Sequence, residues 1–256
     1  GRGGWQETIF LNEPGTKPED NIELEACVLM NLDGESKSFS WEEGYPEFDL
    51  KNANIQIINL KSEYKPFIIF TEGGSFDVFN LEVRPEYSHF PWWNHWPVAQ
   101  IVSDGRSANA PDRASHSSLS WGNPEEDYAL YGMAKNKETV LKIARSWLNP
   151  PSISAGNGFI SSGYDTSQRA YILKAENEES LEVKLAETKT NPVYNPAIVV
   201  KNWAPGKIEA YCNNQLLSSD KYKYDTQYDV QGNPKTLIWV EDDAAETVQY
   251  FFKVLK

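Results

Sequence analysis

The stretch Ile22-Glu23-Leu24-Glu25-Ala26-Cys27-Val28 decides the fold class of this chain. Apolar and polar side chains alternate along it, and a period of two is typical of a β-strand with one buried face. Turn-forming pairs such as Asp33-Gly34 and Asn213-Asn214 separate this run from others of its kind. The other runs occupy residues 8–11, 55–60, 66–70, 76–83, 170–173, 181–185, 197–200, 208–212, 236–240 and 248–254. Short strands with few helices between them predict an all-β protein, an antiparallel β-sandwich or supersandwich rather than a parallel α/β sheet.

One segment has a different period. Between residues 137 and 148 apolar side chains recur at helical spacing, and Asn149-Pro150-Pro151 then ends the pattern. We therefore expect one short helix here, and at most two short helices in the chain. The Pro-Pro step is the best internal boundary. It divides a β-sandwich region, 1–151, from a C-terminal β-sandwich region, 152–256, and the two regions are either packed units or one continuous domain.

Composition excludes several classes of protein. The 256 residues hold 24 Lys and Arg against 37 Asp and Glu, a net charge of −13. Binding to the nucleic-acid backbone needs a cationic excess, so no nucleic-acid partner is expected. No apolar run reaches the roughly 18 residues of a membrane span. Cys27 and Cys212 match no metal-binding spacing, and two free buried thiols are favoured over one disulfide. The chain has no targeting segment or initiator Met, which suggests a mature product or a piece of a longer protein that includes a further N-terminal domain.

A long irregular stretch, from about Arg84 to Asn123, carries most of the functional information. All three histidines of the chain lie within it, and three of the nine tryptophans, Trp92, Trp93 and Trp96, lie within five positions of each other. One interpretation is an aromatic mini-core beneath a long loop, with the histidines hydrogen-bonded inside. The other is a sugar-binding surface, because a Trp ring offers a flat apolar face that suits the C–H face of a pyranose. The residues expected to bind substrate are Trp92, Trp93, Asn94, Trp96, Gln100, Arg113 and His116.

The same stretch has side chains suited to acid–base chemistry. Tyr87, His89 and His95 can donate or accept protons near neutral pH, and Arg106 can neutralise a carboxylate. This combination suits β-elimination from a uronic acid, in which a base removes the proton α to the carboxylate and an acid protonates the leaving oxygen. Hydrolysis is the weaker alternative, because it needs a particular pair of carboxylates. The expected partner is a polysaccharide. A pair of arginines would favour an acidic polysaccharide, despite the negative net charge of the chain.

The sequence offers two alternatives for a bound metal ion. No cofactor is required for the elimination. Zinc held by His89, His95 and His116 with Asp104 or Asp112 is an alternative, although the histidine spacing matches no standard zinc motif. Calcium is a second alternative, with no ligands that the sequence identifies.

Several motifs together resemble proteins of bacterial polysaccharide-degradation systems. They are residues 89–100 (HFPWWNHWPVAQ), 103–106 (SDGR), 112–113 (DR), 146–151 (SWLNPP), 195–197 (NPA) and 201–203 (KNW). Among such proteins the chain is similar to polysaccharide lyases, including the ulvan-lyase kind. The resemblance implies a secreted, periplasmic or cell-surface protein with a sandwich or supersandwich fold and a uronic-acid-containing substrate. Such lyases often join a sandwich to a helical toroid, which this sequence lacks.

The functional expectation is a carbohydrate-active protein. The first hypothesis is a polysaccharide lyase, or a portion of one, with its site in residues 87–116. The second is a non-catalytic carbohydrate-binding or accessory sandwich domain of a larger polysaccharide-degrading enzyme. The third is a structural domain that packs against a missing catalytic domain.

Overall fold

The structure is a computed structural model that describes residues 6–12, 16, 18–40, 50–71, 75–77, 115–123, 129–176, 180–188, 190–244 and 247–255. The chain divides into two compact units, Gly1–Leu141 and Lys142–Lys256. The division falls within helix α2 (Lys137–Leu148), a few residues before the Pro-Pro step. Within the described residues the protein is all-β with two short helices, as the sequence predicts.

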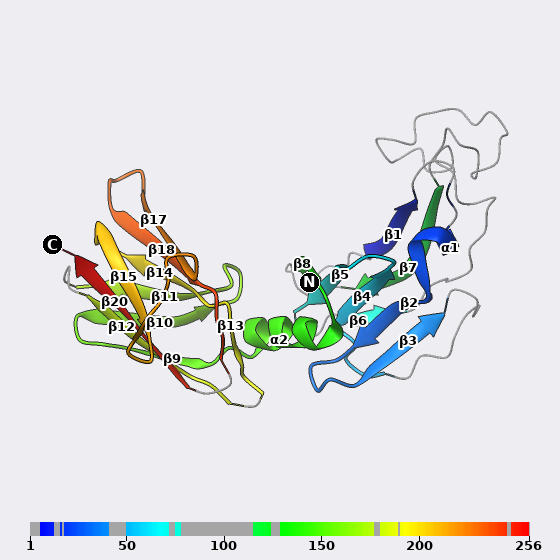
Figure 1. Cartoon of the computed structure of the whole chain (residues 1–256), viewed down its shortest axis with the longest axis horizontal. Coiled ribbons are helices and arrows are strands. Elements are labelled where there is room, and N and C mark those ends of the chain that lie inside the picture. Colours follow the sequence, from blue (N-terminus) through cyan, green and yellow to red (C-terminus); the bar gives the residue numbers. More distant parts are fainter. Residues whose placement is uncertain are drawn as a thin grey trace. The chain divides into compact units, whose positions relative to one another are not determined.

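Unit 1 is built on a five-stranded antiparallel sheet, which we call the β2 sheet (Figure 1). Its strands, in spatial order, are β3 (Ser36–Ser40), β2 (Ile22–Met30), β4 (Ile55–Leu60), β5 (Lys65–Phe70) and β8 (Ala129–Ala134). The run that begins at Ile22 forms β2, and the short helix α1 (Pro18–Asn21) precedes it. The expected single buried face is wrong, because Leu24 is exposed and the five residues from Ala26 to Met30 are all buried. Cys27, Leu29, Phe39 and Phe70 form the centre of the core that this sheet carries.

A three-stranded antiparallel sheet completes the described part of unit 1. Its order is β1 (Gln6–Asn12), β7 (Ser115–Asn123) and β6 (Ser75–Asp77). Strand β7 corrects one expectation, because these nine residues belong to the stretch that the sequence marks as irregular. The strand is rich in serine and has no apolar alternation, and backbone pairing with β1 and β6 holds it in place. Backbone hydrogen bonds do not depend on side-chain polarity, so the hydrophobic pattern gave no sign of it.

Unit 2 is a β-sandwich of two five-stranded sheets (Figure 1). The first, which we call the β14 sheet, has the order β10 (Phe159–Asp165), β11 (Ala170–Ala175), β14 (Ala197–Lys201), β18 (Pro234–Val240) and β17 (Tyr222–Tyr228). The second, the β20 sheet, has the order β16 (Gln215–Leu216), β15 (Lys207–Cys212), β20 (Val248–Leu255), β12 (Leu181–Ala186) and β9 (Ser152–Ala155). A two-stranded ribbon pairs β13 (Val193–Tyr194) with β19 (Asp243–Ala244).

The core of unit 2 lies between these two sheets. Leu173, Val200 and Val240 of the β14 sheet pack with Val183 and Phe252 of the β20 sheet in one cluster, and all five side chains are buried. Every second residue of a strand faces inward, so the clean alternation of strands such as β12 directly reports the buried face. Pairing is antiparallel except between β11 and β14, which are parallel.

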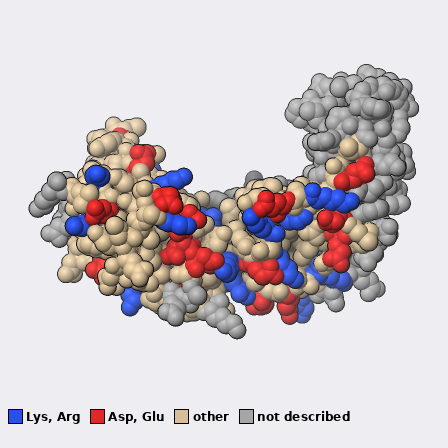
Figure 2. Space-filling model, viewed as in Figure 1, with Lys and Arg blue, Asp and Glu red and all other residues tan. Residues whose placement is uncertain are grey.

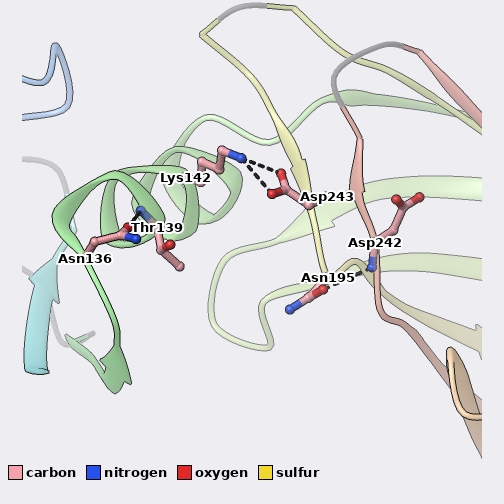
Figure 3. A network of polar contacts seen from close by, with 6 residues as sticks. All are labelled: Asn136, Thr139, Lys142, Asn195, Asp242 and Asp243. Atoms are coloured by element: carbon pink, nitrogen blue, oxygen red, sulfur yellow. Dashed lines mark hydrogen bonds and ion pairs between the residues drawn. The ribbon is translucent and has the colours of Figure 1, made fainter. Parts of the chain in front are cut away.

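Helix α2 occupies the predicted range. Asn136 caps its first turn, because its side-chain oxygen accepts a hydrogen bond from the backbone N–H of Thr139 at 2.9 Å (Figure 3). Lys142 forms an ion pair with Asp243 at 2.7 Å, which ties the helix to strand β19 (Figure 3). Trp147 is buried and donates its indole N–H to the carbonyl of Thr166 at 2.8 Å. The helix therefore has both a polar and an apolar anchor within unit 2.

Both cysteines are free thiols. Cys27 is fully buried, as the sequence suggests, whereas Cys212 is only partly buried. In the part of the chain that the structure describes, neither helix has the length and apolar character needed to cross a bilayer.

Candidate functional site

Most of the residues that the sequence nominates lie outside the described residues. These are Tyr87, His89, Trp92, Trp93, Asn94, His95, Trp96, Gln100, Arg106 and Arg113, together with the alternative metal ligands Asp104 and Asp112. His116 is the exception, since its backbone lies in β7 opposite Leu11 of β1. Their roles as catalytic or substrate-binding residues stay predictions.

A second surface with binding character lies on unit 2. It is the side of the β14 sheet that faces away from the sandwich core, and we call it the outer face. Ala170, Ile172 and Val199 on this face are themselves buried and form a second, smaller apolar cluster. Leu173, Val200 and Ile238 point into the core, so their sequence neighbours point outward. The outward positions on the four strands β11, β14, β18 and β17 are Ala170, Ile172, Lys174, Ala197, Val199, Lys201, Lys235, Leu237, Trp239, Lys223, Asp225 and Gln227.

An apolar groove of about 470 Å³ lies on the outer face, a size typical of ligand sites. Val199 and Leu237 stand opposite each other in its floor, and Trp239 lies beside them. The groove exists because Ala170 and Ala197 are too small to fill the space next to the Trp239 indole, and Ala197 is the direct cross-strand neighbour of that ring. An aromatic ring beside a small-residue hollow is a surface on which another flat apolar ring can stack.

Lys223 is the other cross-strand neighbour of Trp239. Its Nζ lies 5.9 Å from the centre of the indole ring. Such a contact at an exposed site contributes about 0.5–1 kcal/mol, so the flexible lysine can be displaced from the ring at small cost. The lysine then brings positive charge to the edge of the groove.

Three lysines form a row across the same face, which we call the lysine row. Lys174 of β11 stands opposite Lys201 of β14, and Lys201 stands opposite Lys235 of β18. Neighbouring strands are about 4.8 Å apart, so the row spans about 10 Å. Within the described part of the chain no carboxylate forms an ion pair with any of the three. Acidic and basic side chains are otherwise interspersed on the face of the molecule drawn in Figure 2.

The lysine row continues into a polar pocket of about 330 Å³ at the turn between β17 and β18. Lys201 and Lys235 line it together with Asn202 and Tyr228. Asp229 also lines the pocket, and its carboxylate accepts hydrogen bonds from the backbone N–H groups of Gln231 and Asn233 at 2.9 and 2.8 Å. Those bonds and the Asn233 side chain lower the pKa of Asp229, because they stabilise its charged form. The apolar groove, the lysine row and this pocket thus lie along one sheet, with Trp239 and Lys235 about 13 Å apart along β18.

A tyrosine-lined crevice elsewhere in unit 2 is a weaker candidate. It lies between Tyr164, Tyr171 and Arg169, and its internal volume of about 10 Å³ has room for about one water molecule. The ring centres of Tyr164 and Tyr171 are 5.0 Å apart, and burial raises the pKa of both phenols. Tyr171 donates its hydroxyl to the carbonyl of Pro151 at 3.1 Å. The crevice is part of the packing rather than a site for a ligand.

No family model, curated protein or solved structure matches this chain. The geometry of the chain itself is therefore the basis for its functional interpretation.

The motifs of the polysaccharide-lyase resemblance that lie in unit 2 have structural roles. Trp203 is fully buried, and its ring packs edge-on against Phe159 with ring centres 5.9 Å apart. Asn195 and Asn202 have φ values of 45° and 59°, a left-handed conformation that asparagine tolerates better than most residues. The Asn195 side chain also accepts a hydrogen bond from the backbone N–H of Asp242 at 3.1 Å (Figure 3).

Among the described residues no group of three or more His, Cys, Asp or Glu side chains is arranged to hold a metal ion. Of the residues named for the zinc alternative, His116 lies in β7 and the others lie outside the described residues, and the calcium alternative names no ligands.

Sequence reasoning missed the outer face. Trp239 lies in a run that the sequence correctly predicts as a strand, and alternation with the core residues Ile238 and Val240 places its ring outward. Lys174, Lys201 and Lys235 each border a predicted strand. What the sequence lacks is the order of strands in the sheet, which alone brings these four residues together.

Proposed function

We propose that this protein binds a polysaccharide on the outer face of unit 2 and serves in polysaccharide degradation outside the cytoplasm. The observation that carries the proposal is the apolar groove of about 470 Å³ with the Trp239 indole beside it. Sugar rings bind proteins through an apolar C–H face and a polar rim, and this groove has an indole for the first and lysine and glutamine side chains for the second.

The shape of the surface supports a polymer rather than a small sugar. The groove is open, and a second pocket, which Lys201 and Lys235 line, lies further along the same strands at the β17–β18 turn. A ligand that follows β18 from Trp239 to Lys235 covers about 13 Å, which is longer than one sugar ring. Side chains on rigid strands also keep their positions without a ligand, so little ordering entropy is lost on binding.

The test is affinity electrophoresis of the full chain in gels that contain xylan, dextran, alginate or dextran sulfate. The proposal predicts retardation by at least one of these polymers. Trp239→Ala should weaken it at least tenfold, about 1.4 kcal/mol, because the stacking surface is lost. Ala197→Leu should weaken it similarly, because it fills the hollow while the indole remains.

Tyr131→Ala is the matched control. Tyr131 is an aromatic residue on strand β8 of unit 1, with 54 % of its surface exposed. Equal loss of binding in Tyr131→Ala and Trp239→Ala, or retardation by none of the four polymers, would contradict the proposal.

Lyase activity is the second candidate, supported by the Tyr, His and Arg residues of the segment 87–116. β-Elimination from a uronate leaves an unsaturated sugar, which absorbs ultraviolet light. Incubation with uronic-acid polysaccharides should then raise the absorbance, and His89→Ala and His95→Ala should abolish the rise. Binding without turnover would assign the protein to the accessory class instead.

A further inference from the structure

The lysine row has an arrangement that distinguishes it from the other strand lysines of unit 2. On the β20 sheet, Lys184 stands opposite Gln249, and Lys253 stands opposite Glu209. In the lysine row each neighbouring pair is Lys opposite Lys. Like charges directly opposite each other destabilise a sheet, so the row is unfavourable in the unliganded protein.

The surroundings of the row offset this repulsion only in part. Ile160 and Gln227 are the cross-strand neighbours at its two ends, and neither carries a charge. The nearby acidic residues are Glu176, two residues after Lys174 in the chain, and Asp225, diagonal to Lys235 through the pair Asp225 and Leu237. Asp229 lines the pocket with Lys201 and Lys235, and its carboxylate accepts hydrogen bonds from the backbone N–H groups of its own turn. None of these carboxylates forms an ion pair with the row among the described residues. The row therefore offers three ammonium groups to an external anion.

We propose that Lys174, Lys201 and Lys235 bind the carboxylate or sulfate groups of an anionic polysaccharide whose sugar rings lie in the apolar groove. This inference rests on the proposed function and names its substrate class. The row spans about 10 Å, and that length allows it to contact acidic groups on more than one sugar. The net charge of −13 opposes a polyanion at long range, but screening beyond about 8–10 Å leaves the local cations to decide.

A glycan is favoured over a nucleic acid by the neighbouring groove. Its floor is aliphatic, with Val199 and Leu237 facing a single indole, whereas single-stranded nucleic acids bind along successive aromatic stacking positions in a cationic channel. The excess of acidic residues over the whole chain points the same way.

The experiment measures affinities of the full chain for dextran, alginate, dextran sulfate and single-stranded DNA at low and high salt. The triple variant Lys174→Gln, Lys201→Gln, Lys235→Gln removes the charge and keeps most of each side chain's length. It should lose at least tenfold in affinity for alginate or dextran sulfate at low salt and depend less on salt than the wild type. Its affinity for dextran should stay within about twofold of the wild type. Whichever of alginate and dextran sulfate shows the loss identifies carboxylate or sulfate as the anion.

The control variant Lys184→Gln, Lys253→Gln removes charge from the opposite sheet and should bind like the wild type. An equal loss in this control, an unchanged affinity in the triple variant, or DNA binding as tight as glycan binding would each overturn the inference. Trp239→Ala separates it from the proposed function. If Trp239→Ala leaves all affinities unchanged while the triple variant loses anion binding, the groove proposal fails and the lysine row stands. If the triple variant binds like the wild type while Trp239→Ala loses affinity, the proposal for the lysine row fails and the groove proposal stands.

Discussion

Strands β2 and β4 of the unit 1 sheet and strand β18 of the β14 sheet in unit 2 differ in how their two faces are buried. In β2 the five consecutive residues from Ala26 to Met30 are all buried, and in β4 the four from Ile55 to Ile58 are buried. These central strands are therefore covered on both faces. In β18 of the β14 sheet, buried and half-exposed residues alternate from Thr236 to Val240.

This difference shows which strands can carry a binding surface. A strand covered on both faces contributes only to the core, and every substitution there acts on stability. A strand with one open face, such as β18, can carry residues that stability does not require, such as Trp239 and Lys235.

The largest effect is expected from the two tryptophans of the β14 region. Trp203 is fully buried against Phe159, so Trp203→Ala should lower the free energy of unfolding by about 3–5 kcal/mol. Trp239→Ala should lower it by less than about 1 kcal/mol, because the ring lies on the outer face. Urea denaturation of both variants measures the difference. Comparable losses would mean that Trp239 is a structural residue and that the outer side of β18 serves stability rather than binding.

A somewhat smaller effect is expected in the β2 sheet at Gly132. This glycine stands opposite Phe67, and a Cβ added to it would overlap the Phe67 ring. Gly132→Ala should therefore cost about 1–3 kcal/mol of stability. The double variant Gly132→Ala, Phe67→Leu should lose less than the sum of its two single changes, because the obstruction is removed. Strict additivity in thermal or urea unfolding would show that the ring is not the cause.

A pH-dependent effect follows from Cys27 in the doubly covered strand β2. Burial raises the pKa of its thiol to about 12 from an ordinary value of 9.0. A group whose pKa is raised by folding contributes its full stabilisation at pH values below its pKa in the unfolded chain. That contribution is lost as the pH rises toward its pKa in the folded protein. Between pH 9 and 12 the free energy of unfolding should thus fall by up to about 1.4 kcal/mol per pH unit from this thiol alone. Cys27→Ala should show a shallower decline, and identical slopes in the two proteins would count against the burial of the thiol.

The smallest effect is expected in the lysine row. Lys201 stands between two other lysines, so Lys201→Glu should raise the free energy of unfolding by about 0.2–1 kcal/mol relative to the same change at Lys184. Lys184 stands opposite Gln249 and serves as the control for the propensity of glutamate in a strand. A gain in stability together with weaker anion binding would show that the row is kept for binding. No difference between the two substitutions would remove the electrostatic argument for the row.

Much of the fold was predictable because local patterns carry it. Helix α2 and strand β4 have the predicted ranges, and the predicted run 208–212 lies in β15, which the Asn213-Asn214 turn follows. In each case the apolar period or the turn residue is contained in a few adjacent positions. Strands β3, β7, β8, β10 and β17 were missed. In β3 and β7, polar residues dominate and leave no apolar period in the sequence of the strand itself.

The candidate site was harder to predict for a related reason. Clusters of rare residues along the chain, such as the histidines and tryptophans of 84–116, are visible in the sequence. Clusters that form across strands are not, since Lys174 and Lys235 are far apart in the chain and meet only through Lys201 between them. Strand order is a property of the packed sandwich, and neither propensity nor periodicity encodes it locally.

Binding of a polysaccharide to the outer face can be tested by methyl NMR of the full chain during titration with an alginate or sulfated dextran oligosaccharide. The methyl groups of Val199 and Leu237 report on the outer face, and those of Val183 and Leu185 report on the core of the same unit. If the outer face binds the oligosaccharide, the methyl chemical shifts of Val199 and Leu237 should change saturably, with little change at Val183 and Leu185. Saturable changes elsewhere with none at Val199 and Leu237 would contradict binding at the outer face.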